Sequence, residues 1–202
     1  PASVITANNV FAHIDDSTDI LKGIKKLIKE SQGIFIFEVS YLLDVIKNNL
    51  FDTIYHEHLD YHSITPLEKF LNKYEFEIIN IEHLETHGGS IRVTTQLQGG
   101  KFQKSNSVKY FIEKEKQFGL DKIETYLKFS QQINSLGYEL KNLLDSLKSK
   151  NKIIIGYGAP AKATTLLHQF DIGPDTINCI IDDSSWKQSL YSPGKHIPIV
   201  SK

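Results

Sequence analysis

Methionine is absent from this 202-residue sequence, and cysteine, arginine and long apolar runs are scarce. The single cysteine, Cys179, has no partner for an internal disulfide, and the cysteine spacing of a zinc site does not occur. No apolar run approaches the roughly 18 residues that a membrane span needs, and no charged-then-apolar leader is present. The 23 lysine and arginine residues are balanced by 24 acidic ones, which argues against a nucleic-acid partner. We therefore expect a cytoplasmic globular protein that contacts neither membrane nor nucleic acid.

Strands and helices alternate in a first block, residues 1–104. Residues 34–37 are continuously apolar, a pattern typical of a strand that is covered on both faces. Thr65–Glu68 has the pattern of a capping box with proline at the first helical position. Two β-like runs, 76–84 and 90–97, flank a glycine-containing turn. The block predicts an α/β, doubly wound sheet whose antiparallel edge is a terminal hairpin.

A second block, residues 105–150, has a helical pattern. Four leucines recur at steps of four, three and four residues, which predicts a buried seam suited to packing on a neighbour. They are Leu136, Leu140, Leu143 and Leu147. The repeat is too short for a coiled coil, so we interpret the block as a helical connector.

A third block, residues 151–202, begins a new βαβ unit. Its predicted elements are a strand at 152–155, a helix that runs to Phe170, and strands at 177–181 and 197–200. So few strands predict an incomplete domain. Uncovered sheet edges would favour pairing with a second copy of the chain, so a homo-oligomer formed through these edges is expected.

Ionisable side chains are densest in a loop that follows the second strand and precedes a helix. The loop contains Tyr55, His56, Glu57, His58, Tyr61 and His62. Imidazole, with a pKa near ~6.5, suits proton transfer at neutral pH, and a neighbouring carboxylate can orient the ring. The spacing of His56, His58 and His62 also fits a metal site, which is the competing interpretation, and the pattern fits a polar surface loop as well. The residue types alone leave these three interpretations open.

A second group joins a glycine turn to the only arginine of the chain. His87, Gly88 and Gly89 precede Ser90 and Arg92, which lie on one face of the following strand. Paired glycines let backbone amides approach a ligand, and a guanidinium binds phosphate or carboxylate in a bidentate way. An ordinary hairpin turn followed by an arginine in a surface ion pair explains the pattern equally well.

A third group fits the pattern G-x-G-x-x-A between a strand and a helix. Its candidate ligand-binding residues are Gly156, Tyr157, Gly158, Ala159 and Lys162. Backbone amides and the helix dipole could hold a phosphate there, and Asp182–Asp183 after the next strand could bind ribose hydroxyls. A tight turn without any ligand is the competing interpretation.

Four ordered segments together resemble a known family. They are NNVFAHIDD (8–16), FDTIYHEHLDYHS (51–63), THGGSIRV (86–93) and GYGAPAKATTLL (156–167). The sequence resembles the S-adenosylmethionine-dependent sugar C-methyltransferases, which act on nucleotide-linked keto-deoxysugars. The resemblance covers essentially the whole chain, and four segments in the same order are more specific than any one of them.

The resemblance implies an architecture as well. Members combine a small zinc-binding N-terminal domain, a class I methyltransferase (Rossmann-like) domain and a C-terminal Rossmann-like domain. Here it implies the second half of the methyltransferase sheet, the helical connector and an incomplete C-terminal βαβ domain. The zinc-binding cysteines and the glycine-rich cofactor loop are absent, so we expect a fragment with an incomplete S-adenosylmethionine site and no metal of its own. The start at Pro1 and the lack of methionine agree with an excised segment.

The same resemblance implies the chemistry of the site. His58 is expected to be the general base, with Tyr55 and Glu57 beside it, while Asn9 and His13 are expected to line the cofactor cleft. Acid–base work is thereby favoured over a metal role for the histidine loop. His58 would deprotonate the carbon next to the ketone before methyl transfer.

The remaining motifs are expected to contact the nucleotide-sugar substrate. The turn from His87 to Arg92 and the G-x-G-x-x-A loop would supply these contacts, with Arg92 and Lys162 facing anionic groups. The alternative function is a non-catalytic module that binds a nucleotide or NAD through residues 150–202.

Overall fold

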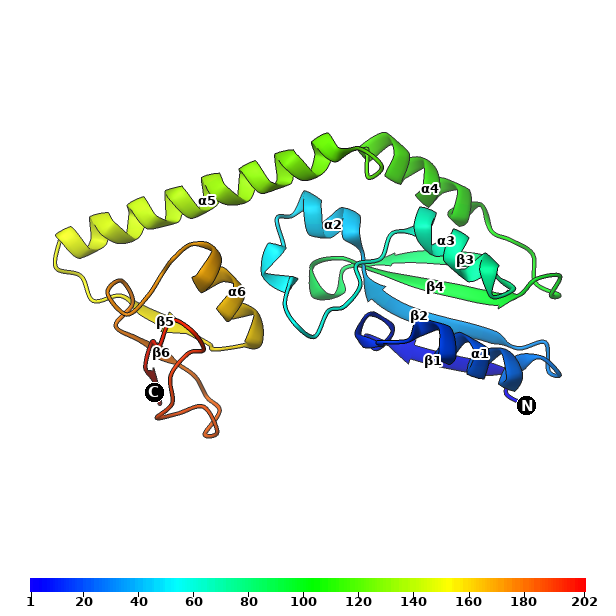
Figure 1. Ribbon diagram of the computed structural model, residues 1–202, viewed down its shortest axis with the longest axis horizontal. Coiled ribbons are helices and arrows are strands. Elements are labelled where there is room, and N and C mark those ends of the chain that lie inside the picture. Colours follow the sequence, from blue (N-terminus) through cyan, green and yellow to red (C-terminus); the bar gives the residue numbers. More distant parts are fainter. The chain divides into compact units, whose positions relative to one another are not determined.

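The chain, described over residues 1–202 by a computed structural model, folds into two compact units (Figure 1). The first comprises Pro1–Leu50 and His56–Tyr126, and the second comprises Phe51–Tyr55 and Leu127–Lys202. Each unit has its own β-sheet, its own helices and its own apolar core. The predicted α/β class is therefore confirmed.

The sheet of the first unit has four strands in the order β1-β2-β4-β3. They are β1 (Val4–Asn8), β2 (Ile34–Ser40), β3 (Phe76–Leu84) and β4 (Ser90–Leu97). β1 and β2 are parallel, and β4 is antiparallel to both β2 and β3, so the terminal hairpin is confirmed. The hairpin forms one edge of the sheet, as predicted, with β3 outermost and β4 between β2 and β3. Most β4 side chains are buried, as expected of a strand with a neighbour on each side.

Helices of the first unit surround an aromatic core. They are α1 (Ser17–Ile28), α2 (Leu42–Lys47), α3 (Ile64–Lys73) and α4 (Asn106–Phe118), with 3-10 turns η1 (Phe11–His13) and η3 (Thr86–Gly88). Of these, α1, α3 and α4 pack on the sheet. The largest fully buried side chains include Phe11, Phe35, Phe37, Tyr41 and Phe76. The rings of Phe11 and Phe37 lie 4.8 Å apart, so η1 is fixed against the sheet directly after β1.

The start of α3 differs from the predicted capping box. The helix begins at Ile64, one residue before Thr65, and no side chain within it caps its amides. Glu115 of α4 does so instead, because its carboxylate accepts from the Ile64 amide at 2.5 Å and the Thr65 amide at 2.9 Å. Glu115 is only 2% exposed. A carboxylate at a helix N-terminus is favourable, and a cap from a distant helix leaves no local sequence pattern.

The second unit contains a short parallel sheet in the order β5-β6-β7. Its elements are η2 (Phe51–Thr53), most of α5 (Ile123–Ser149), β5 (Ile155–Tyr157), α6 (Ala161–Gln169), β6 (Cys179–Ile181) and β7 (Ile199–Val200). The predicted βαβ order is correct, but β5 begins at the end of the predicted strand 152–155. Ile155 is the residue that pairs with the first residue of β6, Cys179.

The buried face of α5 is not the predicted leucine seam. Leu136 and Leu143 are 41% and 56% exposed, whereas Ile133, Gly137 and Leu144 are buried. Gly137 decides the face, because a Cβ there would lie 2.5 Å from a ring carbon of Phe170. The packed ring therefore takes the place of a side chain. Neither α5 nor any other helix is long and apolar enough to cross a membrane.

Candidate active site

The loop with the clustered histidines is attached to η1, which follows β1. The amides of Leu59 and Asp60 both donate to the carbonyl of Ala12, at 3.0 and 3.4 Å. This attachment brings His58 to His13, and their ring centroids lie 4.9 Å apart in an edge-on arrangement. The loop therefore brings His58, the expected base, next to His13, an expected cofactor residue.

Tyr61 extends this pair to a third ring. Its ring centroid lies 6.1 Å from that of His58, again edge-on. His13 is exposed and His58 is half-buried, so solvent and small molecules reach the group. Three proton-exchanging side chains thus gather beyond the carboxyl end of β1, where open α/β sheets place their ligands.

The other histidines of the loop are held differently. The side chain of His56 is 80% exposed, and its Nε2 atom lies 4.0 Å from Glu57. His62 packs on Phe11 with 5.7 Å between ring centroids, and burial lowers its pKa below the ordinary value. No three histidine, cysteine or acidic side chains come close enough to share a metal ion, so the geometry gives no support to the metal interpretation.

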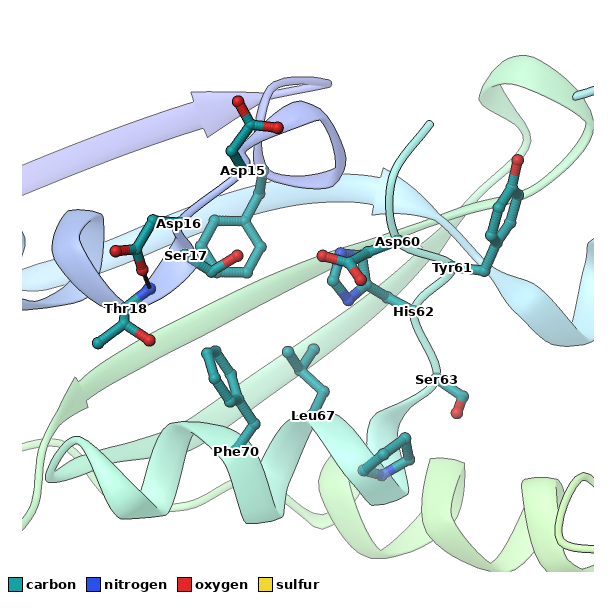
Figure 2. Close-up of a pocket in the computed structure, with 12 residues that line it drawn as sticks. Asp15, Asp16, Ser17, Thr18, Asp60, Tyr61, His62, Ser63, Leu67 and Phe70 are labelled. Atoms are coloured by element: carbon teal, nitrogen blue, oxygen red, sulfur yellow. Dashed lines mark hydrogen bonds between the residues drawn. The ribbon is translucent and has the colours of Figure 1, made fainter. Parts of the chain in front are cut away.

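A cavity of about 390 Å³ lies between this loop and the start of α1 (Figure 2). Asp16 and Thr18 line one side, Asp60 and His62 the opposite side, and Phe70 projects from α3. The Nε2 atom of His62 is fully buried without a hydrogen-bond partner. The lowered pKa of His62 favours its neutral ring, which packs on Phe11.

The turn from His87 to Gly89 is seated tightly against α2. Gly88 has φ +85° and Gly89 φ +131°, and a Cβ at Gly89 would lie 2.4 Å from the Asp44 carboxylate. The side-chain amide of Asn48 donates to the Gly88 carbonyl at 3.1 Å, and the backbone amide of Tyr41 donates to the Gly89 carbonyl at 3.1 Å. Packing against Asp44 therefore requires Gly89, the positive φ favours glycine at Gly88, and the exposed His87 is presented between Thr86 and Gly88.

The arginine that follows this turn is engaged by two carboxylates. Arg92 lies 3.1 Å from Glu38 and 3.3 Å from Glu82, while Ser90 is fully buried and donates to the Thr86 carbonyl at 3.0 Å. The ion-pair interpretation of Arg92 thus matches the geometry. Its contact with an anionic substrate group stays a prediction.

The glycine loop of the second unit is also occupied by an internal carboxylate. The Ala159 amide donates to Asp182 Oδ2 at 2.6 Å, and the Gly158 amide donates to the Ile181 carbonyl at 2.7 Å. These amides are therefore not available to a phosphate in this conformation. The hydroxyl of Tyr157 lies 3.1 Å from Asp183. Both aspartates therefore already accept hydrogen bonds within the protein.

Two further candidate residues belong to the second unit. Tyr55 is half-buried at the end of the segment Phe51–Tyr55, which is assigned to this unit while Glu57 and His58 are assigned to the first. Lys162 lies 3.6 Å from Asp52 of the same segment. Thr165 donates to the Ile54 carbonyl at 3.2 Å. Helix α6 therefore holds the stretch of chain that leads into the histidine loop.

Sequence reasoning missed two acidic residues of the first unit. Asp44, 6% exposed, lies 2.6 Å from His83 and against Gly89. Glu38, 7% exposed, contacts Arg92. A signal was present for Glu38, since it is the one charged residue in the apolar strand β2. Asp44 carries no comparable signal.

Comparison with known families adds to this geometry. Residues 85–202 match the family described as the C-methyltransferase C-terminal domain. The chain belongs to this C-methyltransferase family. Residues 1–81 of the chain match a methyltransferase domain. The predicted resemblance to C-methyltransferases is therefore confirmed.

A curated relative shows how much of such a C-methyltransferase the chain represents. "C-methyltransferase NovU" of Streptomyces niveus is 30% identical over 200 residues, which cover 99% of this chain and 47% of the relative. The chain thus spans about half the length of the curated relative it matches.

Proposed function

We propose that the protein is an S-adenosylmethionine-dependent C-methyltransferase that acts on a nucleotide-linked keto-deoxysugar, with His58 as the base. The observation that carries the proposal is the placement of His58 against His13 at the carboxyl end of β1, in a chain of the C-methyltransferase family. Forming a carbon–carbon bond requires a nucleophilic carbon. A ketone provides one when a neighbouring C–H bond is broken.

Deprotonation is the step for which the histidine loop is suited. A ring nitrogen of His58 would take the proton, and the electron pair of the broken C–H bond would pass into the enolate. Glu57 would orient the base, and a hydroxyl such as that of Tyr55 would donate a hydrogen bond to the enolate oxygen. A positioned base contributes typically ~10²–10⁴-fold to rate.

The cofactor residues fit a partial lining for S-adenosylmethionine. Asn9 and His13 are both exposed where β1 ends, and Asn9 has φ +52°, which turns the chain away from the strand. An amide and an imidazole can hydrogen-bond the polar groups of such a ligand. When bound, the cofactor supplies an electrophilic methyl group. Asn9 and His13 would hold it at the edge where β1 ends.

The test is methyl transfer by the full-length protein with His58→Ala. We expect the rate to fall by about 10²–10⁴-fold. His56→Ala is the matched control, because His56 is exposed on the same loop, and it should keep most of the activity. Exchange of the substrate's acidic proton with deuterated water, measured without cofactor, should also be lost in His58→Ala. Retained exchange would contradict the role of His58 as the base.

A second candidate is the non-catalytic nucleotide module. A glycine loop between β5 and α6 favours it, but the Ala159 and Gly158 amides already donate within the protein. Calorimetric titration of the protein with NAD separates the two: tight NAD binding would favour the module, and its absence would favour the methyltransferase.

A further inference from the structure

Glu38 is a buried carboxylate to which neither the motifs nor the proposed chemistry assigns a task. It lies near the carboxyl end of β2 and is 7% exposed. Burying a carboxylate is unfavourable unless hydrogen bonds and an opposite charge compensate for lost water. The hydrogen-bond and ion-pair partners of Glu38 therefore indicate its structural role.

One contact reaches the glycine turn. Thr86, the first residue of η3, donates its hydroxyl to Glu38 Oε1 at 2.9 Å. The Thr86 carbonyl in turn accepts from the Gly89 amide at 3.0 Å and from the Ser90 hydroxyl at 3.0 Å. Glu38 thereby fixes Thr86, and the Thr86 carbonyl accepts the hydrogen bonds that hold the turn together.

A second contact explains the position of the only arginine. Glu38, Arg92 and Glu82 are direct neighbours across the three strands β2, β4 and β3. Arg92 donates to Glu38 Oε2 at 3.1 Å, so the two oxygens of one carboxylate serve two different partners. A guanidinium can bridge two carboxylates in a way that an ammonium cannot.

A third contact uses the backbone of the same residue. The Glu38 carbonyl accepts from the Asn9 amide at 3.0 Å. Asn9 is an expected cofactor residue, while His87, next to Thr86, is an expected substrate residue. One residue of β2 therefore connects both sides of the candidate site.

We propose that Glu38 is a positioning residue that holds the Thr86–Gly89 turn, and with it His87, in the orientation that receives the substrate. The proposal rests on the proposed function for the identity of that substrate. The Glu38 side chain affects the substrate residues only. The hydrogen bond from the Asn9 amide goes to the Glu38 backbone carbonyl, so it remains when the side chain is substituted.

The test compares Glu38→Ala, Glu38→Gln and Thr86→Val in the full-length protein. In Glu38→Ala, amide hydrogen exchange of a peptide spanning residues 84–92 should accelerate by about tenfold. The KM for the keto-sugar nucleotide should rise by about tenfold, while the KM for S-adenosylmethionine stays within about twofold. Glu38→Gln keeps an acceptor for Thr86 and should lie between Glu38→Ala and the unsubstituted protein.

Thr86→Val removes a single hydrogen bond and keeps the Glu38–Arg92 pair, so it serves if Glu38 variants do not fold. It should raise exchange and the sugar-nucleotide KM by about fivefold. Glu82→Gln is the control, since it removes the charge of the other partner of Arg92 but no bond to the turn, and both readouts should stay unchanged.

Unchanged exchange in Glu38→Ala and Thr86→Val would overturn the proposal. An equal rise of the KM for the keto-sugar nucleotide and the KM for S-adenosylmethionine would also overturn it, because such a rise indicates a loss of structure throughout the first unit. If the unsubstituted protein transfers no methyl group, the proposed function fails, but the exchange experiment still decides the role of Glu38.

Discussion

Each unit has a buried carboxylate beside a glycine turn near the end of a strand, but the two carboxylates have different kinds of hydrogen-bond partner. In the first unit, Glu38 accepts from the side chains of Thr86 and Arg92. In the second, Asp182 accepts from backbone amides, Ala159 at 2.6 Å and Ser184 at 2.9 Å. One carboxylate orients side chains, and the other occupies the amides that a phosphate would use.

This difference teaches that a glycine turn after a strand does not by itself indicate free amides. The two turns look alike in the sequence, yet their glycines serve different needs. Gly89 makes room for Asp44, whereas a Cβ at Gly158 would meet only Pro160, at 3.8 Å. Substitutions at these glycines therefore test the comparison most strongly.

Gly89→Ala is expected to have the largest effect. It combines an unfavourable φ of +131° with a clash against Asp44, and we expect the first unit to lose about 4 kcal/mol of unfolding free energy. Gly158→Ala adds backbone strain at φ +85° without a clash, so the second unit should lose only about 1–2 kcal/mol. Urea unfolding, with hydrogen exchange to assign each transition to a unit, measures both. Equal losses would show that the two turns are equivalent.

The two units should also differ in their response to acid. Burial lowers the pKa of His62 below its ordinary 6.5, so below that pH the unfolded chain binds a proton that the folded first unit does not. Stability of this unit should decline by up to about 1.4 kcal/mol per pH unit until the folded pKa is reached. Urea unfolding at about pH 7.5 and about pH 5.5 measures the decline, which His62→Phe should reduce.

The second unit should resist this mild acidification. Hydrogen bonds from the Ala159 and Ser184 amides hold the pKa of Asp182 below its ordinary 3.8. A depressed carboxylate pKa contributes stability above the unfolded value, and this contribution is lost only as the pH falls below about 3.8. Loss of the second unit first, near pH 5.5, would contradict the assignment.

Arg92→Lys should have a smaller effect than the glycine and histidine substitutions, and Lys187→Arg a smaller effect still. An ammonium can approach Glu38 or Glu82 but does not bridge them, so the first unit should lose about 1 kcal/mol or less. Thermal unfolding of the variant beside Lys187→Arg, the corresponding cation near Asp182, measures the difference. A larger loss for Lys187→Arg would reverse the ranking of the two cations.

Much of the fold could be predicted because its signals are local. The runs 76–84 and 90–97 coincide with β3 and β4, since alternation and a glycine turn lie within one stretch of sequence. The interior place of β4 could not be predicted, because strand order depends on distant partners. The capping of α3 by Glu115 could not be predicted either, because Glu115 lies 50 residues beyond Thr65.

The site was predictable in its residue types but not in its pairings. The histidine loop and the glycine turn were both visible, yet no pattern linked His58 to His13. That link depends on two amides that share the Ala12 carbonyl. Glu38 could have been found as a carboxylate in a buried strand, but its partners depend on the register of three strands.

The short segment Phe51–Tyr55 has a consequence for how the protein folds. Phe51 packs on Phe170 with 5.0 Å between ring centroids, so the second core joins two points of the chain that are 170 − 51 = 119 residues apart. Long-range contacts of this kind form late, because the entropy of closing the loop is lost before any contact compensates for it. The intervening residues belong mostly to the first unit. We therefore expect the first unit to fold early and to shorten that loop before the second core forms.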